Sequence, residues 1–383
     1  MDREDEGYRK VEYIAQKLLE SKEVDNKGTQ EIIENMKEFV FKEFIPKVDR
    51  MDIFEDEYEM LRKIEKIYEK WENIILKPWL REKCVVSILG GFSSGKSSIV
   101  NSILGEDLLP VDVTPTTAIP TYISYGPRKK FKFVDREERQ REISEEVFKM
   151  LSKATKMRES ALLRLLFSYI KYCVMEFPLD VLEDISLLDT PGYNSVDIED
   201  IRKAKEVVKE SNVIVWVMDI EDGTLSGDSV KFIKEITERN GQPFYVVVNK
   251  VDLKPPGERE RVKRNVESVL NKNNIKYEKC ILYTTRSSEY KNEMINIIKS
   301  AKQKDDSIDL NNYIKEIIDR CYKKIGEYMK EKEEVIKLLM SPEKREIVIV
   351  EKIIREIDKE IQEAREILQN LDEMRKKIIF YGG

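Results

Sequence analysis

One short segment carries residue types that bind phosphate groups. Residues 90–97, GGFSSGKS, match the pattern G-x-x-x-x-G-K-[ST], after the apolar run CVVSIL and before the helical run SSIVNSIL. In that context glycines let the backbone wrap phosphates, and amides at the helix start point at the anion. We expect Lys96 to neutralise the terminal phosphates and the Ser97 hydroxyl to bind Mg²⁺. The expected phosphate-binding residues are Gly90, Gly91, Phe92, Ser93, Ser94, Gly95, Lys96, Ser97 and Ser98.

A second tetrapeptide, Asp189-Thr190-Pro191-Gly192, follows the apolar run ISLL. A carboxylate at the end of a strand can reach Mg²⁺ through water, and a glycine amide beyond it can meet a γ-phosphate. We therefore expect Asp189 at the metal and Gly192 at the nucleotide.

A third tetrapeptide, Asn249-Lys250-Val251-Asp252, follows the apolar run FYVVV and can select the base. A carboxylate at Asp252 accepts from both the ring N–H and the exocyclic amine of guanine, a donor pair that adenine lacks. Leaving that carboxylate unpaired in a closed pocket is costly, so the motif favours GTP over ATP. We expect Asn249, Lys250 and Asp252 at the base, with the backbone amides of Thr284 and Thr285 near the guanine carbonyl.

A threonine-rich segment, LPVDVTPTTA, lies between the phosphate loop and Asp189. We expect one of its threonines to close over Mg²⁺ and the γ-phosphate as a mobile switch. Thr116 and Thr117 are favoured, with Thr114 next, and a plain threonine-rich turn is the alternative.

The elements that must position these motifs are short apolar strands separated by polar helical stretches. The runs CVVSIL, DISLLD, NVIVWVMD, PFYVVVNK and KCILYTT are typical of strands buried on both faces of a parallel sheet. We predict an α/β fold, a P-loop domain with a mainly parallel sheet over about residues 81–300.

Helical segments flank that domain. Leu61, Ile64, Tyr68, Trp71 and Ile75 form one apolar stripe, and Ile33, Met36, Val40 and Phe44 form a similar one. Val350, Ile354, Ile357, Ile361, Ala364, Leu368 and Leu371 keep a coiled-coil spacing, and Leu310, Ile314, Ile317, Cys321, Ile325 and Tyr328 mark another stripe. We expect Pro46 and Pro78 to end helices and Ser341-Pro342 to begin one. Residues 1–80 and a hairpin over residues 301–383 should form one helical bundle.

Composition excludes several kinds of chemistry. Histidine is absent, which removes Ser-His-Asp triads, Cys-His pairs and histidine metal ligands. The 68 basic and 74 acidic side chains leave a net charge of -6, so no nucleic-acid partner is expected. The four cysteines match no zinc or redox spacing, and the amino terminus lacks the apolar core of a signal peptide. We expect a cytoplasmic protein without a membrane span.

The motifs together resemble the GTPase domain of the dynamin superfamily, bacterial dynamin-like proteins in particular. The segments that carry the resemblance are GGFSSGKSS, LPVDVTPTTAIPTYI, EFPLDVLEDISLLDTPGYNS and NKVD, within about residues 81–300. The long stretch from Lys96 to Asp189 matches the enlarged domain of that family, with inserted helices near residues 138–168. The resemblance implies GTP hydrolysis, pairing of two GTPase domains, and a helical bundle that moves with nucleotide state. It also implies a membrane or a paired dynamin-like subunit as the partner.

The resemblance leaves the orientation of the attacking water open. The glutamine that Ras-like enzymes carry after D-x-x-G is replaced by Tyr193, and the dynamin phosphate-loop glutamine is replaced by Phe92. Ser93 matches a dynamin serine that helps to hold a monovalent cation, K⁺ or Na⁺, against the phosphates. The expected catalytic residues are therefore Ser93, Lys96, Thr116 and Thr117. A regulatory GTPase switch of the Era-like or ribosome-associated kind, binding a partner in its GTP state, is the alternative function.

Overall fold

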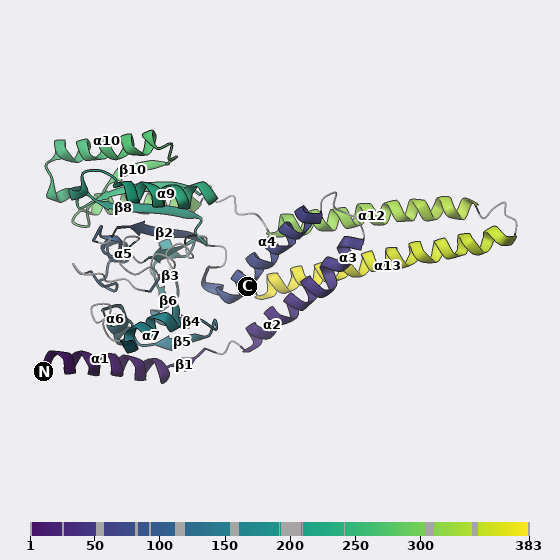
Figure 1. Ribbon diagram of the computed structural model, residues 1–383, viewed down its shortest axis with the longest axis horizontal. Helices are drawn as coiled ribbons and strands as arrows, with labels where there is room; N and C mark the ends of the chain where they lie inside the picture. The colour runs from purple at the N-terminus through teal and green to yellow at the C-terminus, as the bar shows by residue number, and fades with distance from the viewer. Residues whose placement is uncertain are drawn as a thin grey trace. The chain divides into compact units, whose positions relative to one another are not determined.

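The computed structural model describes residues 2–24, 27–50, 57–80, 83–91, 93–111, 119–153, 161–190, 192, 208, 210–240, 242–302, 310–338 and 344–381. The chain forms two compact units. One comprises residues 1–25 and 82–305, and the other comprises residues 26–81 and 306–383. Figure 1 labels the elements of both units.

The first unit is built on one mixed sheet. Among the described residues, its strands are β1 (Lys22–Glu23), β2 (Cys84–Gly90), β3 (Thr121–Tyr125), β4 (Lys130–Asp135), β5 (Gln140–Ile143), β6 (Ile170–Phe177), β7 (Ile185–Asp189), β8 (Val213–Asp219), β9 (Phe244–Asn249) and β10 (Lys279–Leu282). They lie in the order β1-β5-β4-β6-β3-β7-β2-β8-β9-β10. Strands β7, β2, β8, β9 and β10 are mutually parallel, whereas β3 joins β7 in antiparallel fashion. The five apolar runs predicted as strands are these five parallel strands.

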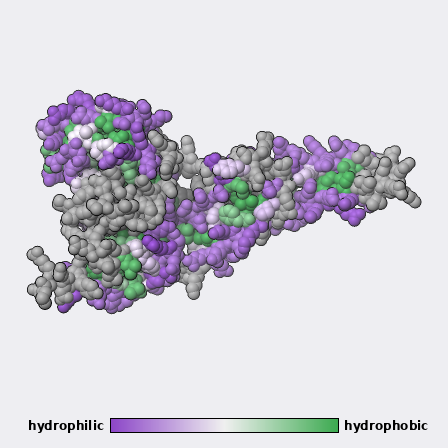
Figure 2. Space-filling view, in the orientation of Figure 1, coloured by the Kyte–Doolittle hydropathy of each residue, from purple (hydrophilic) through white to green (hydrophobic). Residues whose placement is uncertain are grey.

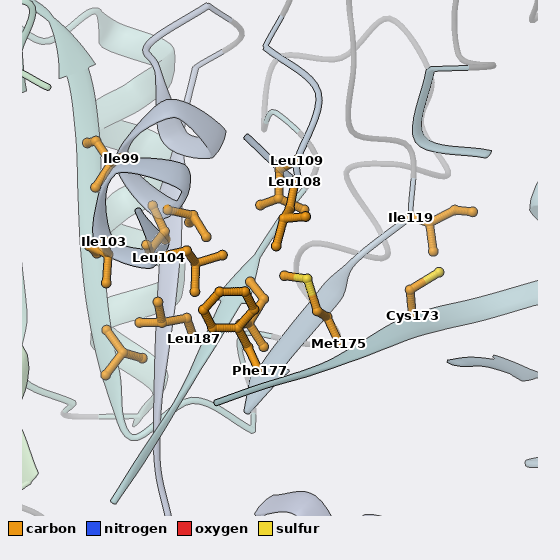
Figure 3. Packing of buried hydrophobic residues seen from close by; sticks show 14 of the residues in the cluster. Ile99, Ile103, Leu104, Leu108, Leu109, Ile119, Cys173, Met175, Phe177 and Leu187 are labelled. Carbon is orange, nitrogen blue, oxygen red and sulfur yellow. The ribbon is translucent and has the colours of Figure 1, made fainter. Parts of the chain in front are cut away.

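Alternation along the strands divides the apolar side chains between two buried faces. On β8, Val213, Val215 and Val217 pack with α5 (Lys96–Leu104) and α11 (Ser288–Lys302). The side chains between them, including Trp216, pack with α9 (Gly227–Asn240) and α10 (Pro256–Lys272). Because successive side chains of a strand point to opposite faces, burial on both sides requires such unbroken apolar runs. Figure 3 shows the first face where α5 meets the sheet, with Ile103 and Leu187 among its residues.

The amino-terminal helix corrects one prediction. We expected residues 1–80 to join the helical bundle, but α1 (Asp2–Leu19) packs in the first unit with α6 (Glu145–Lys153) and α7 (Ala161–Tyr169). Val11, Ile14 and Leu18 enter the core of that unit. Strand β1 then pairs with β5 and forms the outer edge of the sheet. An amphipathic stripe predicts that one helix face is buried, and it does not specify the surface against which that face packs.

The second unit consists of helices. They are α2 (Lys27–Glu38), a π-helical segment (Phe39–Phe44), α3 (Ile45–Arg50), α4 (Glu57–Leu76), a short 3₁₀ helix (Pro78–Leu80), α12 (Leu310–Leu338) and α13 (Lys344–Tyr381). Helix α4 ends before Pro78, as predicted. Pro46 lies inside the continuous helical stretch 27–50, near the start of α3, which corrects its assignment as a helix end. Pro46 closely follows the π-helical segment Phe39–Phe44, where the regular α-helical hydrogen bonds are already interrupted, so the N–H group that proline lacks costs less there.

The core of this second unit joins helices that are far apart in sequence. Ile64 and Tyr68 of α4 share one apolar cluster with Ile317 of α12 and with Ile357 and Ile361 of α13. The predicted packing of the stripes on each other is therefore confirmed for these residues, while Ser341-Pro342 lies outside the described residues. Figure 2 shows mainly hydrophilic residues on the described surface of α12 and α13, interrupted by hydrophobic patches. Within the described ranges, no helix is long and apolar enough to span a membrane.

Candidate nucleotide-binding site

The predicted phosphate loop connects the end of β2 to the start of α5. Gly90 and Gly95 adopt φ values of 149° and 91°, which residues with a Cβ rarely adopt. A Cβ on Gly90 would lie 2.1 Å from the Val217 carbonyl oxygen, and one on Gly95 would lie 2.3 Å from Asn249 Nδ2. Both glycines are thus required by the close approach of neighbouring strands. Ser94 Oγ donates to the Gly91 carbonyl oxygen at 2.9 Å and stabilises the turn between them.

Lys96 lies buried at the first position of α5, 7% exposed. Its Nζ donates to the carbonyl oxygens of Gly90 at 3.2 Å and Gly91 at 3.0 Å. Burial lowers the pKa of Lys96 from 10.5 to about 8, against the opposing effect of the Asp189 carboxylate. Carbonyl oxygens carry no formal charge, so an anion held by the loop would relieve the cost of burying this ammonium group.

The two expected metal residues lie together. Asp189 ends β7 beside Ile88 of β2, and Ser97 Oγ donates to Asp189 Oδ2 at 3.0 Å. Both side chains are buried. One hydroxyl and one carboxylate suit Mg²⁺, which prefers oxygen ligands and usually keeps water and substrate phosphate oxygens as its remaining ligands.

Other predicted residues are less fully defined. Gly192 is half-buried, and its amide contact with a γ-phosphate stays a prediction. Phe92 and the three switch candidates Thr114, Thr116 and Thr117 lie outside the described residues. Ser93 has a positive φ of 58° in the middle of the loop. Its proposed contact with a cation also stays a prediction.

The base-selecting motif lies next to the phosphate loop. Asn249 ends β9, and its Nδ2 donates to the Ser94 carbonyl oxygen at 2.9 Å, which ties the two motifs together. Lys250 has a left-handed backbone, with φ 60°, and its Nζ pairs with Asp219 Oδ2 at 2.6 Å. Asp219 ends the parallel strand β8 at the same edge of the sheet. It was missed in the sequence, although its position at the end of a predicted strand is a signal that could have identified it.

Asp252 receives contacts from the loop that follows β10. Thr284 Oγ1 donates to Asp252 Oδ1 at 2.6 Å, and Arg286 Nη1 lies 2.9 Å from Asp252 Oδ2. We expected the backbone of Thr284 to act at this site, and its buried side chain was missed. Thr285 is exposed. The loop therefore holds the carboxylate through side chains, and the expected backbone contacts with guanine stay predictions.

A cavity of about 970 Å³ opens beside this loop. Ser98, Thr285 and Arg286 line it, together with the segment 105–111 that leads toward the predicted switch. Asn101 of α5 fixes that segment, because its Nδ2 donates to the Leu109 carbonyl oxygen and its Oδ1 accepts from the amides of Leu108 and Leu109. The predicted nucleotide site is thus bordered by a wall that a single buried amide side chain holds in place.

Comparison with known proteins identifies similar chains over the same region. The model of the dynamin family matches residues 86–251. A bacterial dynamin-like protein of Nostoc punctiforme is 29% identical over 43% of this chain and 24% of its own length. Dynamin-like protein 2 of Campylobacter jejuni is 29% identical over 49% of this chain and 29% of its own length. The chain thus spans less than a third of the length of these two relatives.

A solved structure described as an oligomerised bacterial dynamin pair matches with a TM-score of 0.47 and 19% identity. The match covers 91% of this chain and 54% of the other.

Proposed function

The chain belongs to the dynamin superfamily, and from this premise we propose that it binds GTP with Mg²⁺ and hydrolyses it to GDP and phosphate. The observation that carries the proposal is the connection of three motifs at one edge of the sheet. Ser97 at the end of the phosphate loop donates a hydrogen bond to Asp189 of the second motif. Asn249 of the base motif donates one to the Ser94 carbonyl oxygen of the loop.

Each proposed role follows from the chemistry of the side chain. The Lys96 ammonium and the amides at the start of α5 bind the phosphates. Ser97 and Asp189 hold Mg²⁺, which neutralises charge on the phosphate oxygens when bound. Asp252 accepts from the guanine N–H groups, and Thr284 keeps its carboxylate in place.

Hydrolysis then requires a water molecule placed in line with the γ-phosphate. We assign its orientation to the switch segment, with Thr116 or Thr117 closing on the triphosphate. Ser93 would hold a monovalent cation that offsets developing charge. Neither Tyr193 nor Phe92 supplies the side-chain amide that other GTPases use, so we expect slow basal turnover.

We further propose that GTPase domains pair and that nucleotide state moves the helical unit. Helix α13 has 38 residues, or about 57 Å at about 1.5 Å per residue, which suits a lever. The proposed setting is the cytoplasm, at the inner face of a membrane, with membrane remodelling as the process. Four buried thiols without disulfides support a reducing compartment.

The test is GTP turnover per molecule measured at rising protein concentration, with Lys96→Ala as the inactive control. Pairing of GTPase domains predicts that turnover per molecule rises with concentration. Constant turnover would instead favour a regulatory switch. Absence of any GTP turnover above the Lys96→Ala control would contradict the enzymatic proposal.

A second experiment tests the membrane setting. The protein is sedimented with anionic liposomes in the presence of GDP or of a nonhydrolysable GTP analogue. The proposal predicts more co-sedimentation with the analogue. Equal, background-level sedimentation in both states would contradict it.

A further inference from the structure

Both oxygens of the carboxylate that would select guanine are already engaged by the protein. Thr284 Oγ1 donates to Asp252 Oδ1 at 2.6 Å, and Arg286 Nη1 lies 2.9 Å from Oδ2. The Asp252 side chain is only 23% exposed, so few other groups can reach it. Guanine must therefore share the carboxylate with these contacts or displace them.

The two contacts differ in how easily they can be displaced. Thr284 is buried, and its Oγ1 also accepts from the amide of Arg286 at 3.3 Å. Its loop is fixed to the base motif, because the Val251 amide donates to the Tyr283 carbonyl oxygen. The Arg286 side chain is 77% exposed and lines the cavity of about 970 Å³. The Arg286 side chain can therefore move away from Asp252 into the cavity, whereas Thr284 is held in place.

The chemistry of Arg286 resembles that of guanine. A guanidinium group presents adjacent N–H donors in one plane, as do the N1–H and 2-amino groups of guanine. A carboxylate oxygen has two lone-pair positions, so Oδ1 can keep Thr284 and accept from guanine as well. Oδ2 has the same capacity, but the Arg286 guanidinium is a planar group about as wide as the donor edge of guanine, so Arg286 and the base cannot both lie in front of Oδ2.

We propose that Arg286 is an internal competitor for guanine, which holds Asp252 in the nucleotide-free protein and must swing into the adjoining cavity before the base can bind. This inference rests on the proposed function, since it assumes that Asp252 selects guanine. Only the fraction of molecules with Arg286 displaced is competent to bind. The contact therefore slows nucleotide association and leaves dissociation unchanged.

The test is stopped-flow association and dissociation of fluorescently labelled GDP with the wild type and with Arg286→Ala. We expect the association rate of the variant to rise about two- to fivefold, the size of effect that one exposed ion pair gives, with an unchanged dissociation rate. Arg261→Ala is the matched control, because it removes the same charge from another exposed arginine. Arg261 is 67% exposed and pairs with Glu258 on α10. The control should bind like the wild type.

Faster dissociation from Arg286→Ala would overturn the proposal, because it would show that Arg286 contacts the bound nucleotide. Unchanged rates would also overturn it, because they would show that the ion pair does not compete. No GDP binding by the wild type would instead be the failure of the proposed function.

A double substitution tests whether the effect passes through Asp252. An amide at this position has no charge to hold Arg286. In the Asp252→Asn background, Arg286→Ala should leave the association rate of labelled xanthosine diphosphate unchanged. A rate increase as large as that in the wild-type background would overturn the proposed competition for the carboxylate.

Discussion

The predicted site in the sheet unit and the core of the helical unit differ in how their function is divided among side chains. In the first, single polar residues have separate tasks, as when the Asn249 side chain ties the base motif to the phosphate loop. In the second, apolar side chains of α4, α12 and α13 share one core. A substitution of one of these polar residues in the first should remove a chemical step and leave the fold, whereas a core substitution in the second should remove packing and leave the chemistry.

The largest effect is expected from a substitution that destabilises only the helical unit. Ile357 is 4% exposed in the core of that unit, so Ile357→Asp inserts an unpaired charge there. We expect this unit to lose about 4 kcal/mol of stability. Hydrogen exchange of α4 should accelerate, while GTP binding stays near the wild-type value.

Ile353→Asp is the matched control, because Ile353 lies one turn earlier on α13 and is 37% exposed. It should leave α4 protected. Wild-type protection of α4 in Ile357→Asp would contradict the shared core.

The next largest effect is expected from a substitution that abolishes nucleotide binding and leaves the fold intact. Lys96→Ala removes the buried ammonium that we assign to the phosphates. We expect a loss of GTP affinity of at least about a hundredfold, or ~3 kcal/mol, since hydrogen bonds to charged groups are the strong ones. Calorimetric titration measures the loss, and circular dichroism should show an unchanged fold. Wild-type affinity in this variant would contradict the phosphate-loop assignment.

A pH titration sharpens the role of the same residue. Phosphates bind the protonated amine, and burial lowers the pKa of Lys96 to about 8 in the free protein. GDP affinity should therefore be greatest below pH 8 and fall above it, by up to about tenfold per pH unit. Lys96→Arg stays protonated over this range, so any binding that it retains should lack this dependence.

The same pKa has a consequence for stability. The folded pKa of Lys96 lies below the ordinary value of 10.5. The cost of burying its charge is fully present below pH 8 and is relieved as pH rises toward 10.5. The contribution of Lys96 to the free energy of unfolding should thus increase with pH in that window, opposite in direction to the change in GDP affinity.

The smallest predicted effect concerns the residue that holds Asp252. Thr284→Val keeps the shape of the side chain and removes the hydroxyl that donates to Asp252 and accepts a longer bond from the Arg286 amide. We expect guanine nucleotide affinity to fall about fivefold, the typical worth of one hydrogen bond. Thr237→Val is the control, because it removes a hydroxyl bond to Ile233 on α9, away from the site. Equal affinities in both variants would mean that Thr284 does not position the carboxylate.

The parallel strands could be predicted because burial on both faces of a sheet gives each strand a continuous run of mainly apolar residues in the sequence. The strands Cys84–Gly90 and Val213–Asp219 are buried along their whole length and are therefore mainly apolar, and the motifs that follow such strands locate the predicted site. The meeting of the two expected metal residues followed from the same rule, since Asp189 ends β7 and Ser97 lies at the start of α5, just after the adjacent parallel strand β2. Chemistry fixed to strand ends is thus visible in a single sequence.

The packing of the amino-terminal helix and the contacts of Asp252 could not be predicted, because they depend on tertiary contacts that leave no pattern in the local sequence. The stripe of Val11, Ile14 and Leu18 would suit a bundle as well as the sheet unit that it joins. The bond from Thr284 to Asp252 links two loops that meet only because β9 and β10 are neighbours. No local sequence pattern predicts that Arg286 pairs with Asp252.

The most direct test of the central claim is the base preference of the wild type and of Asp252→Asn. Titration calorimetry with GDP and xanthosine diphosphate, in the presence of Mg²⁺, measures both affinities. The wild type should prefer GDP, and Asp252→Asn should prefer xanthosine diphosphate, because its amide donates to the 2-oxo group where a carboxylate only accepts. An unchanged preference for GDP in Asp252→Asn would remove Asp252 from the site and contradict the assignment of a guanine-specific pocket.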